Sequence, residues 1–171
     1  MTTQSELPWI AEAKKLVGLR EVVGIKHNPN IVAWLKDLKS AWLEDETPWC
    51  GTFIAHCLKT ASRSLPVHWY RAKAYLDYGT RLSKPAYGCI AVKSRVGGGH
   101  VFFVVGKTKD GYLVGLGGNQ GNAVSLAKYH PSVIDGYVWP SKSDGVASLP
   151  YPARFDLPVY NGSLSAVTSE S

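Results

Sequence analysis

The start of one helix constrains this chain more than any other stretch of its sequence. The pattern of residues 47–59 predicts a helix in which Thr47 is the N-cap and Pro48 takes the first helical position. Cys50 then lies in the first turn, at the head of the apolar side of that helix. Backbone N–H groups and the helix dipole favour an anion there, which lowers the pKa of a thiol and makes it a nucleophile. The alternative is a cysteine that serves only as a small buried side chain.

A nucleophilic thiol needs a base, and His100 is the best candidate. It stands at the beginning of an apolar strand, after three glycines that leave its approach open. His56 projects from the polar side of the helix, about 240° from Cys50, and is therefore excluded as the base. We expect the other three histidines to be solvated, because each falls in a connection or at the end of an element: His27, His68 and His130.

A third polar residue should orient His100, and two neighbours in a glycine-rich turn compete for that place. Strands over residues 100–106 and 112–116 are expected to form a hairpin, and the loop length sets its register. A four-residue loop places Asn119 on the face of His100, whereas a three-residue loop places Gln120 there. We expect Asn119, with Gln120 as the alternative. Both residues are also common turn formers, so a purely structural role stays open.

Three short motifs occur in a characteristic order: Pro48-Trp49-Cys50-Gly51-Thr52-Phe53, then Gly99-His100-Val101, then Gly117-Gly118-Asn119-Gln120. Together with residues 8–13, 27–29 and 137, they resemble the papain-like NlpC/P60 and CHAP cell-wall hydrolases over about residues 8–140. The similarity is strongest to the small branch found in bacteriophage and prophage lysis proteins. One departure is Cys89, because related sequences carry Asp where this chain has Gly88-Cys89-Ile90.

The order of predicted elements agrees with the α+β papain-like fold that this resemblance implies. Helices are expected over residues 8–17, from residue 29, and over residues 68–78. Five short strands follow, over residues 88–93, 100–106, 112–116, 123–127 and 134–139. Helices followed by an antiparallel sheet are typical of α+β proteins. We expect one catalytic domain over residues 1–140 and an extended, partly disordered tail over residues 141–171.

Charge and cysteine content narrow the function classes. The net charge of +6 suits an anionic partner, but the basic residues are scattered, so nucleic acid is not expected. Three cysteines, an odd number, argue against a disulfide framework, and Cys57 and Cys89 are expected to be structural. The sequence has no paired Cys/His spacing of a zinc site, and no metal or cofactor is expected. Glu44, Asp45 and Glu46 lack the spacing of an EF-hand and are interpreted as an exposed charged loop, with a calcium site as the alternative.

No stretch is apolar enough to span a membrane, and the first residues lack the pattern of a signal peptide. We therefore expect a monomer that is made in the cytoplasm and reaches the cell wall by release or delivery. 

The resemblance implies a cysteine hydrolase that cleaves an amide bond of peptidoglycan, as an endopeptidase or an N-acetylmuramoyl-L-alanine amidase. Cys50 would be the nucleophile and its backbone N–H an oxyanion donor, with His100 as the base. Aromatic candidates for the substrate groove are Trp49, Trp69 and Tyr70, with core packing as the default alternative for each. Two other hypotheses stay open: a different Cys–His enzyme, such as an acyltransferase or a toxin-like effector hydrolase, and a non-catalytic wall-binding module.

Overall fold

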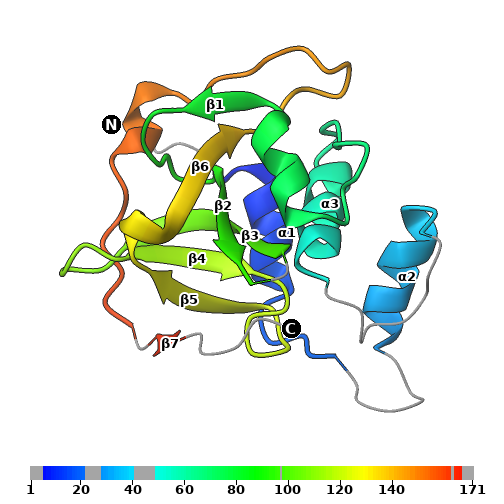
Figure 1. Cartoon of the computed structure of the whole chain (residues 1–171), viewed down its shortest axis with the longest axis horizontal. Helices are drawn as coiled ribbons and strands as arrows, with labels where there is room; N and C mark the ends of the chain where they lie inside the picture. The colour runs from blue at the N-terminus through cyan, green and yellow to red at the C-terminus, as the bar shows by residue number, and fades with distance from the viewer. Residues whose placement is uncertain (1–5, 22–27, 41–48, 97, 163, 167–171) are drawn as a thin grey trace.

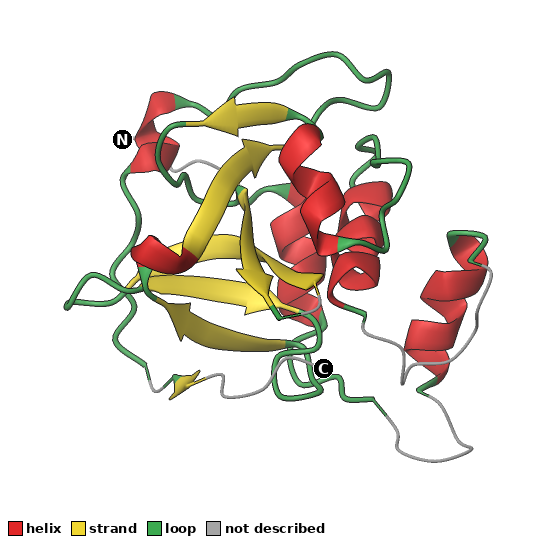
Figure 2. Ribbon diagram, viewed as in Figure 1, coloured by secondary structure: helices red, strands yellow, loops and turns green. Residues whose placement is uncertain are grey.

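The computed structural model has an α+β architecture and describes residues 6–21, 28–40, 49–96, 98–162 and 164–166 (Figures 1 and 2). Its α-helices are α1 (Pro8–Lys15), α2 (Pro29–Asp37) and α3 (Cys50–Thr60). Its 3-10 helices are η1 (Ala72–Asp77), η2 (Pro131–Val133) and η3 (Pro152–Phe155). Its strands are β1 (Thr80–Leu82), β2 (Ile90–Arg95), β3 (Gly98–Lys107), β4 (Leu113–Gly117), β5 (Ser125–Tyr129), β6 (Ile134–Trp139) and β7 (Ser165–Ala166).

The strands form one sheet with the order β1-β6-β2-β3-β4-β5-β7. All five predicted strands are present, and their ends differ from the prediction by no more than two residues. The prediction of only five strands was wrong, because the described residues add β1 and β7. Neither has enough residues for an alternating pattern: β1 pairs antiparallel with β6, and the two-residue β7 pairs parallel with β5.

Local capping explains where the first two α-helices begin. Pro8 and Pro29 each take the first helical position, where the missing N–H costs no hydrogen bond. The Asn28 side chain accepts a hydrogen bond from the N–H of Asn30 at 2.8 Å, which confirms the predicted N-cap. Within the described part of the chain, no helix combines the length and the apolar character needed to cross a membrane.

Two helix predictions need correction. The helix α3 begins at Cys50 with Trp49 as its N-cap, two residues later than Pro48, and Thr47 and Pro48 lie outside the described residues. The helix predicted over residues 68–78 is a turn followed by the shorter 3-10 helix η1. In that turn the carbonyl oxygen of Trp69 lies 2.9 Å from the Tyr75 hydroxyl, a side-chain contact that replaces a regular helical hydrogen bond.

The central strand β3 is buried on both faces of the sheet. On one face Phe103 packs against Phe53 of α3, with ring centroids 6.3 Å apart. On the other face Phe102 stacks on Tyr129 of β5 at 4.2 Å. Burial on both faces explains why the strand is a continuous apolar run in the sequence rather than an alternating one. Figure 1 shows α1 and α3 beside the sheet, with α2 further out.

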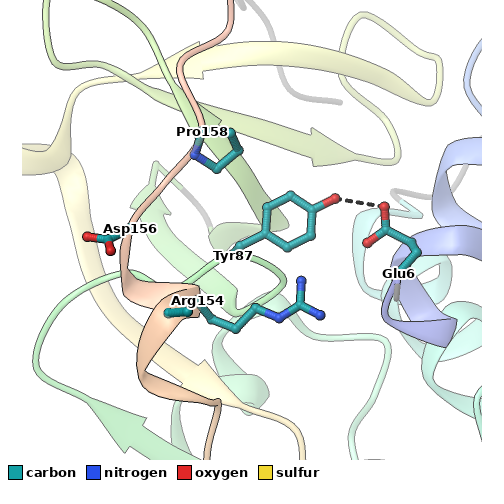
Figure 3. A pocket seen from close by; sticks show the side chains of 6 residues that line it. Glu6, Tyr87, Arg154, Asp156 and Pro158 are labelled. Atoms are coloured by element: carbon teal, nitrogen blue, oxygen red, sulfur yellow. Dashed lines mark hydrogen bonds between the residues drawn. The ribbon is translucent and has the colours of Figure 1, made fainter. Parts of the chain in front are cut away.

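The segment after residue 140, expected as an extended, partly disordered tail, is joined to the domain by backbone hydrogen bonds near residues 154–160, although most of its described residues are exposed. The backbone N–H of Lys107 donates to the carbonyl oxygen of Pro158 at 2.9 Å, and the N–H of Tyr160 donates to the carbonyl oxygen of Lys107 at 2.8 Å. Arg154 lies over the ring of Tyr87, whose hydroxyl donates to Glu6 at 2.9 Å (Figure 3). Glu6, Tyr87 and Arg154 border a cavity of about 440 Å³, together with Ala153, Asp156 and Pro158.

His56 of α3 is partly buried and joins this helix to α1 and α2. Its Nε2 lies 2.8 Å from Glu12 of α1, and its ring stacks on Trp34 of α2 at 4.6 Å. Burial raises the pKa of Glu12, but the hydrogen bond and charge of His56, together with those of Lys15, outweigh burial and lower it. His56 therefore binds Glu12, in agreement with its exclusion as the catalytic base.

Glu12→Gln should lower the thermal midpoint of unfolding at neutral pH. Because the pKa of Glu12 is lower in the folded state, its carboxylate stabilises the fold above the ordinary value of 4.5. That stabilisation is lost as the pH falls through the lowered folded-state pKa, so the difference between the variant and the wild type should shrink in acid. Asp37→Asn, which removes the exposed partner of Lys59, is the control and should have little effect. A pH-independent difference for Glu12→Gln would contradict this account.

Candidate active site

Cys50 is the first residue of α3 and lines a cavity of about 280 Å³. The other walls come from residues 70–73 at the start of η1, from Arg95 of β2, and from Gly98 and Gly99 of β3. The side chain of the N-cap residue, Trp49, makes no capping hydrogen bond to the N–H groups of the first turn. The predicted first-turn position of the thiol is confirmed, and the thiol adjoins a space that a ligand can enter.

Close packing holds the η1 wall of this cavity against the start of α3. A β-carbon at Gly51 would lie 2.6 Å from the carbonyl oxygen of Trp69, so only glycine permits this approach. The hydroxyl of the fully buried Tyr75 lies 3.0 Å from the carbonyl oxygen of Gly51 and 2.9 Å from that of Trp69. Tyr75 was not predicted to belong to the site; its place on the apolar side of the predicted helix was the only signal in the sequence.

The charged side chains that line the cavity are all cationic: Arg71, Lys73 and Arg95. Arg95 also donates from Nε to the carbonyl oxygen of Gly99 at 3.1 Å, which ties the end of β2 to the strand that carries His100. Among the described lining residues there is no acidic side chain. These cations therefore favour an anionic group on a bound molecule.

His100 lies on β3, directly after the Gly99 that borders the cavity, and is only 1% exposed. Its Nε2 lies 3.0 Å from Oε1 of Gln120. The hydroxyl of Tyr129 donates to the same oxygen at 2.7 Å, and the rings of Phe102 and Tyr129 lie 5.9 Å from the imidazole. The imidazole is thus hydrogen-bonded to an amide oxygen and lies beside the stacked rings of Phe102 and Tyr129.

The hydrogen bonds of Gln120 determine which imidazole nitrogen carries the proton. Its Nε2 donates to the carbonyl oxygen of Ser125 at 2.7 Å and approaches that of Gly115 at 3.3 Å. Since carbonyl oxygens only accept, the amide nitrogen must face them and Oε1 must face His100. An amide oxygen also only accepts, so Nε2 of His100 carries the proton. In the neutral imidazole the lone pair is then on Nδ1.

Gln120, and not the expected Asn119, therefore holds His100. The N–H of Thr108 bonds to the carbonyl oxygen of Tyr112, so the hairpin has the three-residue loop that predicted Gln120. A bulge between Val104 and Gly106 then shifts the register back by one residue.

A turn after β4 finally decides the choice between the two residues. The strand β4 ends at Gly117, and Asn119 has a φ of 59°, which reverses the chain and brings Gln120 to the imidazole. Gly117 leaves room for the amide, since a β-carbon there would lie 2.7 Å from Oε1 of Gln120. Asn119 is 1% exposed, and its Oδ1 has no hydrogen-bond partner among the residues that the structure describes.

The three aromatic groove candidates have different positions. Tyr70 lines the cavity beside Cys50. Trp69 is half-buried and packs edge-on against Tyr70, with ring centroids 5.5 Å apart. Trp49 is 1% exposed and packs on Gly118, where a β-carbon would lie 2.8 Å from its ring. Trp49 is therefore a core residue and does not line the groove, because its large apolar ring is buried by packing.

The other cysteines and histidines lie away from this cavity. Cys57 and Cys89 are fully buried, and burial raises the pKa of both thiols, that of Cys89 to about 12. His68 and His130 are exposed, as expected, and His27 is outside the described residues. In the described part of the chain no three His, Cys, Asp or Glu side chains are grouped to hold a metal. The acidic residues 44–46 lie outside it.

Comparison of the chain with protein-family models, with curated proteins and with solved structures found no match. The site is therefore interpreted from its own geometry and from the motifs in the sequence.

The Gln120 contact predicts a measurable tautomer of His100. In the wild type, ¹⁵N NMR should show the neutral imidazole protonated at Nε2, because Gln120 accepts that hydrogen bond. Gln120→Ala should remove this preference, and Asn119→Ala should retain it. An Nδ1-protonated ring in the wild type, or loss of the preference in Asn119→Ala alone, would contradict the geometry.

Proposed function

We propose that this protein is a cysteine hydrolase with a papain-like fold that cleaves an amide bond of peptidoglycan, as in bacteriophage lysis proteins. The observation that carries the proposal is that Cys50, the first residue of α3, lines a cavity bordered by β3, the strand that carries His100. The imidazole of His100 is held by a hydrogen bond to the side-chain amide of Gln120. The sequence motifs around Cys50, His100 and Gln120 resemble those of wall hydrolases and supply the substrate class. No metal or cofactor is part of the proposed reaction.

In the proposed reaction the Cys50 thiolate attacks the carbonyl carbon of the scissile amide. The resulting oxyanion accepts a hydrogen bond from the backbone N–H of Cys50 at the helix start. His100, which carries the thiol proton, gives it to the departing amine, and the C–N bond breaks to leave a thioester on Cys50. Water then loses a proton to His100 and hydrolyses the thioester, releasing the acid and restoring the thiol.

The orientation of His100 supports its role as the base. A neutral ring with its proton on Nε2 presents the Nδ1 lone pair, the form that accepts a proton from a thiol. Gln120 fixes this form without adding a charge, and Tyr129 donates to the same oxygen. These two residues are positioning residues, so their loss should slow turnover without removing the nucleophile or the base.

The cationic lining of the cavity supports an anionic substrate. Arg71 and Lys73 lie on the same wall as Tyr70, beside Cys50. Stem peptides of peptidoglycan carry carboxylates close to their amide bonds, and these would be attracted by the two cations. Tyr70 offers an aromatic surface for the apolar parts of the same peptide.

Purified cell walls test the proposed activity directly. In a zymogram the wild type should clear the wall, and mass spectrometry of the products should identify the new termini: sugar–peptide cleavage indicates an amidase, and cleavage within peptides an endopeptidase. Cys50→Ala and His100→Ala should not clear it. Gln120→Ala should be slowed about 5- to 150-fold, since an unpaired buried amide partner costs about 1–3 kcal/mol. Activity should persist in EDTA.

Lys109→Gln, at the tip of the β3–β4 hairpin, is the matched control and should clear the wall like the wild type. Clearing by Cys50→Ala would refute the nucleophile. A wild type that binds walls without releasing any product would instead favour a non-catalytic binding module. Transfer of an acyl group to an added amine, with little hydrolysis, would favour an acyltransferase.

A further inference from the structure

A second cavity, of about 420 Å³, lies at the other end of α3 from Cys50. Arg63, three residues after the end of α3, lies on its wall together with Trp9 of α1 and Trp139 of β6. The segment after residue 140 closes the cavity with Lys142, with residues 147–151 and with Arg154. The reaction proposed for Cys50 uses none of these residues.

The charged residues on this wall are Arg63, Lys142 and Arg154, and no acidic residue is among the described lining. Arg63 and Lys142 are directly opposite each other in an isolated antiparallel β-bridge. Like charges at directly opposite positions destabilise a strand pair. Neither residue forms an ion pair with any residue that the structure describes. A bound anion would relieve the repulsion between them.

The guanidinium of Arg63 is held in place before any ligand arrives. It lies 4.8 Å from the ring of Trp9, and its Nη1 donates to the carbonyl oxygen of Pro140 at 3.2 Å. That contact uses one of its five N–H donors. A planar guanidinium with further donors suits the several oxygens of a phosphate group, and its fixed position reduces the entropy lost on binding.

Arg154 supplies the third cation. Its guanidinium lies 5.4 Å from the ring of Tyr87, and Figure 3 shows its side chain running beside that ring. It borders both this cavity and the neighbouring one that contains Glu6. Because Arg154 borders two cavities, substitutions of Arg63 and Lys142 test this site more specifically.

We propose that this cavity, which we call the Arg63 pocket, binds the phosphate group of a small polyol or sugar phosphate ester. Three cations suit a group with several anionic oxygens better than a single carboxylate. The volume also exceeds that of inorganic phosphate, which leaves room for a small organic body beside Trp139 and Tyr151. The pocket is separate from the Cys50 cavity, so it does not depend on the proposed hydrolase activity.

Calorimetric titration of the full chain tests the Arg63 pocket with four probes: inorganic phosphate, glycerol 3-phosphate, glycerophosphoglycerol and glycerate. Glycerol 3-phosphate should bind saturably and more tightly than inorganic phosphate, and glycerate should bind much more weakly. Lys142→Gln should weaken binding about tenfold, since a hydrogen bond to a charged group is lost. Lys109→Gln removes the same charge far from the pocket and should bind like the wild type.

Arg63 also contacts Trp9 and Pro140, so its variants are interpreted together with their thermal midpoints. Arg63→Lys keeps the charge and should retain part of the affinity, whereas Arg63→Gln should lose more. Equal binding of the monoester and the diester would point to a phosphodiester polymer as the source, and preference for the monoester to a free metabolite. Absence of saturable binding, wild-type affinity in Lys142→Gln, or equal weakening in Lys109→Gln would overturn the proposal.

Discussion

The hydrogen bond between Gln120 and His100 is the interaction on which the candidate site depends. It forms because the chain turns at Asn119 in a left-handed conformation and because Gly117 has no side chain to obstruct the amide. Backbone carbonyl oxygens hold the other end of that amide, which fixes its direction. The tautomer of His100 is thereby determined by hydrogen bonds that extend two strands away from the imidazole.

A second constraint sets the position of the thiol. The start of α3 can approach η1 closely only because residue 51 is glycine, and the Tyr75 hydroxyl bonds across that contact. Cys50 is therefore presented to a cavity with cationic walls, while Cys57, two turns along the same helix, is buried in the core. One helix thus carries a candidate nucleophile and a structural cysteine, and their surroundings account for the difference.

Local patterns predicted much of this structure. The cap at Asn28, the five central strands and the first-turn position of Cys50 follow from signals within a few residues, and all are present. The choice of Asn119 over Gln120 was wrong because a bulge in β3 and a left-handed turn, two non-periodic features, decide that contact. The strands β1 and β7 were missed because tertiary packing, rather than local pattern, determines them, and the same packing places the groove candidate Trp49 in the core.

The pH dependence of Cys50 alkylation tests most directly whether the thiol and His100 form a catalytic pair. Iodoacetamide labelling with peptide mapping measures the rate at each cysteine in the wild type and in His100→Ala. Cys50 should react with a midpoint well below the ordinary thiol value of about 8.5, and much faster than Cys57 or Cys89. His100→Ala should raise that midpoint. A midpoint that does not change, or faster labelling of Cys57, would contradict the account.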